Sequence, residues 1–262
     1  AGQIVTPGGT SALVAGDKVT VNLGLTGLVS IDVAVGSDAA RVDNSGLVAA
    51  DGGKVLLTAK SAAPMLASAV NQTGTVRANS IASRNGEVWI EASSGDARLA
   101  GTTQATGSGA GQTGGRIVAT GKSVTLVSGS VTDASGAAGG GQVLVGGGWQ
   151  GKDATIATAG SVTQEAGAVI KADATTSGAG GTAVLWSAKA TRMDGSISAR
   201  GTGSGAGGQV ETSSQGSLGL AGQVDVAADS GQGGNWLLDP ATLDVTTTGS
   251  ALVGNTNGTN PT

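Results

Sequence analysis

The sequence predicts an all-β fold, a right-handed parallel β-helix (solenoid) of about eight coils with one or two inserted loops. Two observations predict this fold. A Gly-Gly-x-apolar unit recurs along the 262 residues, and the segments between these units are short runs of Val, Ile, Leu and Ala separated by turn signals. Because both features repeat together, one structural unit is expected to recur along the chain.

The period of the recurring unit is typical of a solenoid. Its second glycine stands at positions 53, 86, 115, 141, 181, 208 and 234, so the steps are 33, 29, 26, 40, 27 and 26 residues. A single coil cannot bury its apolar face, so stability is expected to come from the interfaces between stacked coils. Glycine is expected at the corners because tight turns often need positive φ. The β-helix is predicted for residues 1–245, and residues 246–262 are expected to be a Thr/Gly/Asn-rich tail or the start of a further repeat.

Each short step contains three strand-like pieces, which predicts a three-sided coil. Within residues 115–140 these pieces are 116–119, 123–126 and 130–134, and the same order returns after Gly208. Alternation along the strands predicts two inward columns. The first contains Val55, Leu57, Val88, Ile90, Ile117, Ala119, Val143, Val145, Trp236 and Leu238, and the second contains Val48, Val76, Val131, Val169, Ile197 and Val224.

Two irregular segments interrupt the repeat. The 40-residue step exceeds the period near 146–153, and insertions in repeats map to loops, so this segment is expected to leave the rod or fold back over it. Residues 61–70 have a helix-tolerant composition and are expected to form a short helical turn or a bulging loop.

The composition excludes several classes of function. His and Cys are absent, which excludes histidine-based catalysis and sites that bind metal through thiolates. The net charge is −4, no basic stripe is present and aromatic residues make up 2%, so no nucleic-acid partner is expected. No apolar run approaches the roughly 18 residues that a membrane-spanning helix needs. No cofactor is predicted.

Carboxylates are the remaining candidates for catalysis, because parallel β-helices can carry acidic clusters on one face. Asp133, Asp173 and Asp225 follow the preceding turn glycine by four, six and three residues, so they are not expected to align. We therefore predict no catalytic residue and no enzyme. The strings at 109–114 and 203–208 match the Gly-x-Gly-x-x-Gly dinucleotide pattern, but strands rather than helices are expected to follow, so corner loops are predicted.

The four tryptophans fall into two groups. Trp89, Trp186 and Trp236 lie within strand units and are expected to pack in the core or on its shoulder. Trp149 lies in the inserted segment, where it either anchors the loop or faces a ligand or partner. The candidate partner-binding loop contains Trp149, Gln150, Lys152 and Asp153.

Several segments resemble one known family in a shared order. They are 42–60, with its NSG-LVAADGGKVLLTA run, then 147–152, 170–174, 195–201 and 235–240. Together they make the chain similar to the filamentous-haemagglutinin-like exoproteins of two-partner secretion. The resemblance implies a secreted or outer-membrane surface protein of a Gram-negative bacterium and an outer-membrane two-partner-secretion transporter as partner. The family's secretion signature with its Asn-Pro-Asn motifs is missing, so the β-helical shaft region is expected.

Three functions follow as hypotheses. The first is a secreted structural and adhesive exoprotein, a non-catalytic adhesin shaft that meets a host or neighbouring-cell receptor or glycan. The second is an extracellular filament subunit that forms a homo-polymer by end-to-end stacking, because neither end shows an obvious polar cap. The third is a β-helical polysaccharide-processing enzyme.

Overall fold

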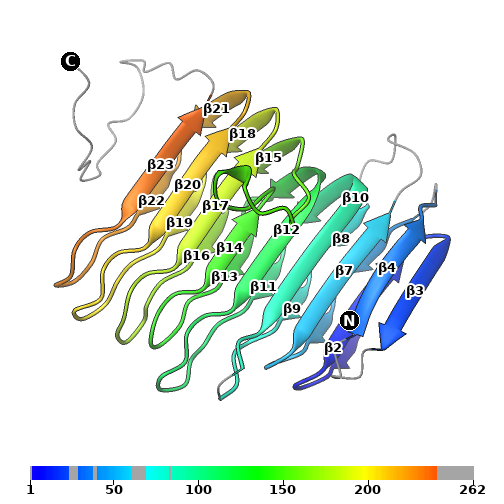
Figure 1. The fold of residues 1–262 in the computed structure, drawn as a ribbon, viewed down its shortest axis with the longest axis horizontal. Coiled ribbons are helices and arrows are strands. Elements are labelled where there is room, and N and C mark those ends of the chain that lie inside the picture. Colours follow the sequence, from blue (N-terminus) through cyan, green and yellow to red (C-terminus); the bar gives the residue numbers. More distant parts are fainter. Residues whose placement is uncertain (1, 24–28, 38–39, 61–68, 83, 241–262) are drawn as a thin grey trace.

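The coils stack one on another along a single axis from the N-terminal to the C-terminal end (Figure 1). The computed structural model describes residues 2–23, 29–37, 40–60, 69–82 and 84–240. The predicted tail at 246–262 and residues 61–68 of the segment predicted as a helical turn or a bulging loop lie outside the described residues. The last residue of that segment, Val70, begins a strand instead. No helix in the described part of the chain is long and apolar enough to cross a membrane.

The first face of the coil is a ladder of eight parallel strands. Its path runs through β2 (Thr10–Ala15), β7 (Lys54–Lys60), the first half of β10 (Glu87–Leu99), the first half of β12 (Arg116–Leu126), β14 (Gln142–Val145), β17 (Thr182–Ser187), β20 (Gln209–Ser214) and β23 (Asn235–Pro240). Long strands β10 and β12 bend around the corner, so their second halves belong to the next face.

The second and third faces complete each coil. The second face contains β5 (Val42–Asn44), β8 (Val70–Gln72), the ends of β10 and β12, β15 (Ser161–Gln164), β18 (Ala190–Met193) and β21 (Ser217–Leu220). The third contains β1 (Gln3–Val5), β6 (Leu47–Ala49), β9 (Thr75–Arg77), β11 (Thr102–Gln104), β13 (Val131–Asp133), β16 (Val169–Lys171), β19 (Ser196–Ser198) and β22 (Gln223–Asp225). The first and third faces each hold eight strands, so the predicted parallel β-helix of about eight coils is confirmed.

The core is a slim aliphatic column between the three faces. Side chains of the first predicted column from Val55 to Val145 are fully buried, as alternation predicted. The second predicted column is wrong at two positions. Thr132 and Ile170, not Val131 and Val169, stand in register with Val48 and point inward. Both strands carry β-branched residues on both faces, so alternation alone was ambiguous, and a one-residue shift reverses every side chain.

The repeated glycines are needed because the backbones of neighbouring coils come very close. None of the second glycines has positive φ, so the reason predicted for them is wrong. A Cβ at Gly115, Gly141, Gly181 or Gly208 would lie 2.1 Å from the carbonyl oxygen of the equivalent glycine one coil earlier. A Cβ at Gly53 would lie 1.9 Å from the Gly9 carbonyl oxygen, so the column begins at Gly9, which the sequence analysis did not include in the repeat.

Polar side chains also link successive coils just beyond the third face. The Asp51 carboxylate accepts a hydrogen bond from the Asn79 N–H at 3.0 Å, and the Asn79 side chain accepts one from the Thr106 N–H at 3.0 Å. Later in the rod, the Asp173 carboxylate accepts from the Arg200 N–H at 2.7 Å. These acidic and amide groups therefore support the stack by pairing with the next coil's backbone.

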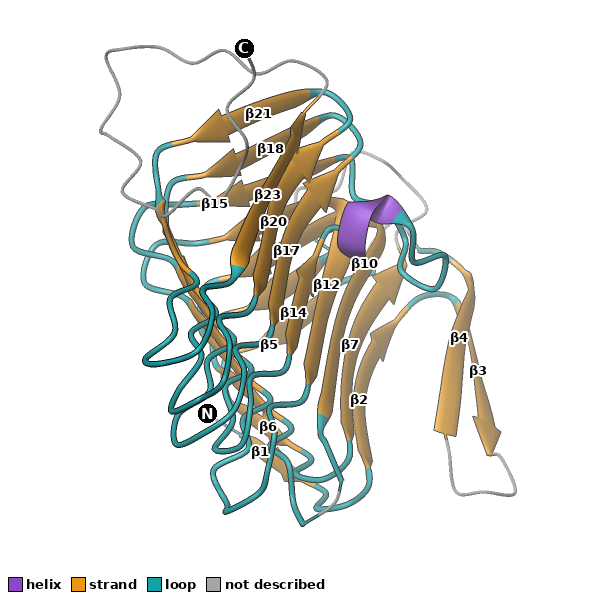
Figure 2. Ribbon diagram, turned by 60° about the vertical axis from the view of Figure 1, so that its left-hand side comes forward, coloured by secondary structure: helices purple, strands orange, loops and turns teal. Residues whose placement is uncertain are grey.

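An antiparallel hairpin that the sequence reading missed leaves the rod near its N-terminal end. It consists of β3 (Lys18–Leu23) and β4 (Val29–Val35), which among the described strands pair only with each other. Figure 2 shows both strands projecting away from the first face. The hairpin is therefore the one described sheet that is not part of the coil stack.

Candidate functional site

The inserted segment predicted near 146–153 folds back over the first face of the rod. We call residues 146–160 the strap. It contains the short 3₁₀ helix η1 (Trp149–Gly151), which Figure 2 shows lying over the strands of the first face. Contacts join η1 to β17 and β20. The strap contains all four residues predicted to bind a partner, so we treat it as the candidate functional site.

An apolar cluster on the outer surface of the first face lies under the strap. Its buried members are Val118, Leu144, Val184 and Trp186 of the strands and Ile156 of the strap itself, and Trp89 and the strap residue Trp149 pack against them. The Trp186 ring is only 7% exposed, although its strand position points out of the rod. Aromatic burial of this kind supplies most of the stabilisation of a small outer cluster.

Close backbone contacts fix the strap on the Trp186 ring. A Cβ at Gly151 would lie 2.4 Å from this ring, and one at Gly147 would lie 3.0 Å from it. Gly151 also has a φ of 66°. The glycines of the strap therefore let its backbone cover the indole directly.

Three polar contacts hold the strap to strands on both sides of β14. The Gln150 N–H donates to Oε2 of Glu211 at 2.7 Å, and Arg116 forms an ion pair with Asp153 at 3.0 Å. The Thr120 hydroxyl donates to the Ala157 carbonyl. The strap thus reaches β12 on one side and β20 on the other.

Glu211 is a fully buried carboxylate that the sequence reading did not single out. Burial raises the pKa of its carboxyl above the ordinary value of 4.5, and the Gln150 N–H opposes this in part. No signal in the sequence distinguishes Glu211 from an exposed strand residue, because its burial depends on the strap that covers it. The strap therefore sets the environment of this acid.

We expect Glu211 to make stability fall as the pH rises. Because its pKa is higher in the folded state, its contribution is fully present below about pH 4.5 and is lost as the pH rises through the raised pKa. Urea unfolding of the wild type and Glu211→Gln across this pH range checks the sign. The wild type should lose free energy of unfolding relative to the variant, and a difference that is flat or rises with pH contradicts the prediction.

The four residues predicted to bind a partner all lie in the strap, but their exposure differs. Trp149 is half-buried against the outer cluster, so it anchors the loop. Gln150 is half-buried, with a φ of 54°, and its Oε1 accepts from Lys152 Nζ at 2.6 Å. Lys152 is exposed, whereas Asp153 is half-buried. Hydrogen bonds from Thr155, and then the charge of Arg116, lower the pKa of Asp153. Binding of a partner by this loop stays a prediction.

Trp89 lies among three charged side chains beside the strap. Its Nε1 donates to Glu87 at 3.1 Å, and Lys54 and Arg116 lie 4.7 and 5.3 Å from its ring centre. Cation–π contacts of this kind stabilise a partly exposed indole. Trp89 therefore packs on the shoulder of the rod, as predicted.

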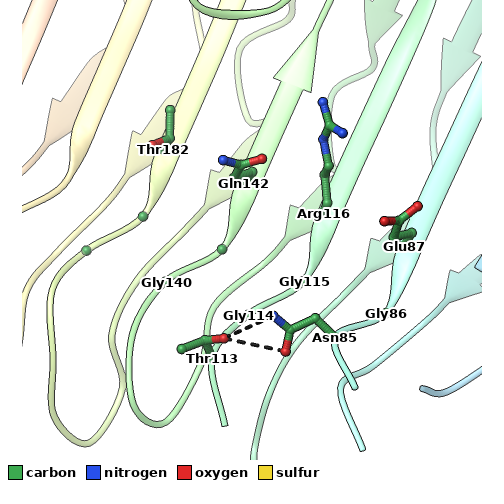
Figure 3. Close-up of a pocket in the computed structure, with 13 residues that line it drawn as sticks. Asn85, Gly86, Glu87, Thr113, Gly114, Gly115, Arg116, Gly140, Gln142 and Thr182 are labelled. Carbon is green, nitrogen blue, oxygen red and sulfur yellow. Dashed lines mark hydrogen bonds between the residues drawn. The ribbon is translucent and has the colours of Figure 1, made fainter. Parts of the chain in front are cut away.

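An open groove of about 480 Å³ follows the corner where the first face begins. Its floor is the repeated glycine pairs, and Figure 3 shows side chains of four successive strands above it: Glu87, Arg116, Gln142 and Thr182. Asn85 and Thr113 hydrogen-bond at 3.3 Å on the other side. Since the glycines are required by the close approach of neighbouring coils, the groove follows from the stacking itself. The strings at 109–114 and 203–208 lead into β12 and β20, so strands follow them as predicted.

The acidic residues align better than the glycine spacing suggested. Asp133 and Asp225 occupy the same position in β13 and β22, in register through Lys171 and Ser198. The distance from glycine to strand varies between coils, which is why counting from the glycines was wrong. Three strand spacings of about 4.8 Å still separate the two carboxylates. Within the described ranges, no three acidic side chains gather into a group that could hold a metal ion.

Comparison with known proteins finds similarity to a solved structure. No family model matches the chain, and no curated protein matches it. The crystal structure of the HMW1 secretion domain from Haemophilus influenzae is similar, with a TM-score of 0.70 and 28% sequence identity. The match covers 91% of this chain and 59% of that one, so this chain spans about three fifths of the matched protein.

This relation extends the resemblance found in the sequence. The shaft region was predicted because the secretion signature was missing, whereas the matched structure is that of a secretion domain. The coils are therefore similar to a part of such exoproteins that is concerned with export. The chain is similar, in fold and in sequence, to a filamentous-haemagglutinin-like exoprotein of two-partner secretion, and the predicted family resemblance is confirmed.

Proposed function

We propose that the chain is the export-directing and structural part of an adhesive exoprotein displayed by a Gram-negative bacterium. An outer-membrane two-partner-secretion transporter recognises it and carries it to the cell surface. The observation that carries the proposal is the likeness of 91% of the chain to a secretion domain. On the surface, the stacked coils act through length and rigidity rather than through chemistry.

The use of the charged residues supports a structural role. Arg77 binds Asp51 through two hydrogen bonds of 2.8 and 3.0 Å, and Arg200 pairs with Asp225 at 2.6 Å. Asp173 is also occupied, since it accepts from Ser198 at 2.7 Å. These groups join successive coils, so the polysaccharide-processing alternative gains no support from them.

The strap is the part of the rod that we expect a host or neighbouring-cell surface to contact. It stands over the first face, and Lys152 is its exposed cation. The rigid attachment to the Trp186 cluster lowers the entropy that the loop would lose on binding. A receptor or glycan that contacts Lys152 would therefore meet a loop that is already ordered.

Secretion that depends on the transporter tests the proposal. The chain, preceded by a signal peptide, is produced in a Gram-negative host with and without the outer-membrane transporter of its own locus. We expect folded protein outside the cell only when the transporter is present, and display of the chain should raise adhesion to cell layers. Retention in the periplasm in both strains would exclude recognition by the transporter, and unchanged adhesion would exclude the adhesive role.

A filament built by end-to-end stacking is favoured by one feature of the N-terminal end. Of the strands that the structure describes, β1 pairs with β6 alone, and Ile4 and Val5 are 41% and 52% exposed at this edge. Unpaired edges of this kind promote association. Sedimentation over a range of concentrations tests the filament, because species that stay monomeric at the highest concentration would exclude it.

A further inference from the structure

The β3–β4 hairpin is amphipathic, with one apolar and one polar face. Val19 pairs with Val33 and Val21 with Ile31, and partners in an antiparallel pair lie on the same side of the ribbon. The opposite side carries Thr20 and Asn22 of β3, with Asp32 of β4 opposite Thr20. Such alternation is typical of a strand pair with one covered face.

The apolar face of the hairpin is buried at one position and exposed at others. Val33 on the inner strand is 9% exposed, and its side chain reaches the position that a Cβ on Gly16 would occupy. Lys60 holds the same strand to the rod, since its Nζ donates to the Val33 and Ala34 carbonyls at 2.9 and 3.2 Å. On the outer strand, Val19 and Val21 are 40% and 55% exposed. On the face that carries Val33, the uncovered apolar surface is therefore greatest on β3, and on β4 Val35, beyond the register shift, is also 48% exposed.

The same strand also has a free edge. β4 is the only described strand that pairs with β3, so one side of the β3 backbone meets no other described strand. A two-stranded hairpin has marginal stability on its own, and a third strand is the usual remedy. The free edge and the exposed valines both lie on β3, so a single added strand could cover both.

The charges and the size of the hairpin discriminate between occupants. Asp17, Lys18 and Asp32 are the charged residues of 17–35, and the chain as a whole carries −4, which disfavours an anionic lipid surface. A second copy would need about 20 to 30 residues on each side for a standard interface. The two strands have six and seven residues, which is too few. An added strand needs only the edge and a few side chains.

We propose that β3 is the edge to which an extended strand from the periplasmic part of the outer-membrane transporter adds. Aliphatic residues at alternate positions of that strand pack on Val19 and Val21, and a carboxylate faces Lys18, which forms no ion pair with described residues. This inference rests on the proposed function and adds the surface that the transporter contacts.

The hairpin is suited to recognition of a chain that has not yet formed its coils. Its strands pair across a short stretch of sequence, whereas each coil pairs with residues a full repeat away. Local hairpins form within microseconds, long before long-range parallel pairing. A strand supplied by the transporter would stabilise this early element during export.

Two matched variants test the inference on the full chain. Val19→Lys/Val21→Lys places two charges on the apolar face, and Thr20→Lys/Asn22→Lys places the same charges on the polar face of the same strand. Circular dichroism and thermal unfolding establish that both retain the coils. We expect the first variant to bind the detergent-solubilised transporter at least 10-fold more weakly and the second to stay within about twofold of the wild type.

Hydrogen exchange of the wild type supplies a readout that needs no variant. Amides of β3 should become protected on transporter binding, while those of β7 stay unchanged. If the wild type binds the transporter and both variants keep its affinity, or both are weakened equally, the hairpin inference is overturned. Recognition by the transporter would then still stand. No binding by the wild type overturns both.

A second copy of the chain or a lipid surface on β3 would give different experimental results. A wild-type dimer that Val19→Lys/Val21→Lys abolishes would assign β3 to a second copy. Co-sedimentation of the wild type with phosphatidylcholine or phosphatidylglycerol vesicles, lost in that variant, would assign it to a lipid surface. Either result overturns the inference.

Discussion

Gly181→Ala is expected to lower the free energy of unfolding by about 3 kcal/mol or more, the upper range for overpacking. The new Cβ would lie 2.1 Å from the Gly141 carbonyl oxygen and 2.7 Å from the Gly140 carbonyl carbon. Both neighbours are backbone atoms, and the Gly141 carbonyl accepts a hydrogen bond from the Thr182 N–H at 2.9 Å where the β14–β17 ladder begins, so it cannot move without breaking that bond. Urea unfolding followed by circular dichroism measures the loss.

Gly219→Ala is the matched control. Gly219 lies within β21, is exposed, and its Cβ would meet only the Arg192 side chain at 3.8 Å. Its φ is not positive, so alanine should be neutral or slightly stabilising. Equal losses for the two variants would mean that close approach of the coils is not what requires glycine at position 181.

Trp186→Ala should cost about 3–5 kcal/mol, as removal of a large buried aromatic side chain usually does. The ring is 7% exposed and is the surface on which Gly147 and Gly151 of the strap lie. Its loss leaves Val184 and Leu144 uncovered and removes the support of η1. Urea unfolding gives the free energy, and limited proteolysis should show faster cleavage within 146–160.

Trp149→Ala distinguishes the contribution of Trp149, which belongs to the strap, from that of Trp186, which lies beneath it. Trp149 is half-buried, so its removal from the same cluster should cost clearly less than removal of Trp186. Proteolysis of the strap that stays at the wild-type rate in Trp186→Ala would show that polar contacts alone hold the loop.

The coil plan could be predicted because it repeats. Glycine pairs and three short aliphatic runs recur in each step, so the strands after Gly115 and after Gly208 were found with their correct order. The exact inward residue was less secure where neighbouring positions are both β-branched, as in Val131–Thr132. There the register is fixed by the adjacent coils, which a single strand does not reveal.

The hairpin was missed although its signal is present. Residues 18–23 and 29–33 both alternate between apolar and polar side chains, which is typical of a hairpin. The β-helix was predicted for residues 1–245, and an alternating strand fits a coil as well as a hairpin, so the pattern alone did not separate the two. Its antiparallel pairing follows from the short connection between the two strands.

The strap was located by its excess length, but its contacts could not be predicted. Arg116 lies 37 residues before Asp153, and Glu211 lies 61 residues after Gln150. Both distances depend on how many residues each intervening coil contains, which varies along the chain. The burial of Glu211 is therefore a property of the assembled rod.

The strap also changes how the rod should come apart. In a simple stack each unit contacts only the next one, so denaturation can enter at an end and advance one unit at a time. Here one loop joins β12 to β20, with β14 and β17 between them. The strap thereby links four consecutive coils. Unfolding that begins at the C-terminal end should stop at these coils until all four unfold together as one cooperative unit.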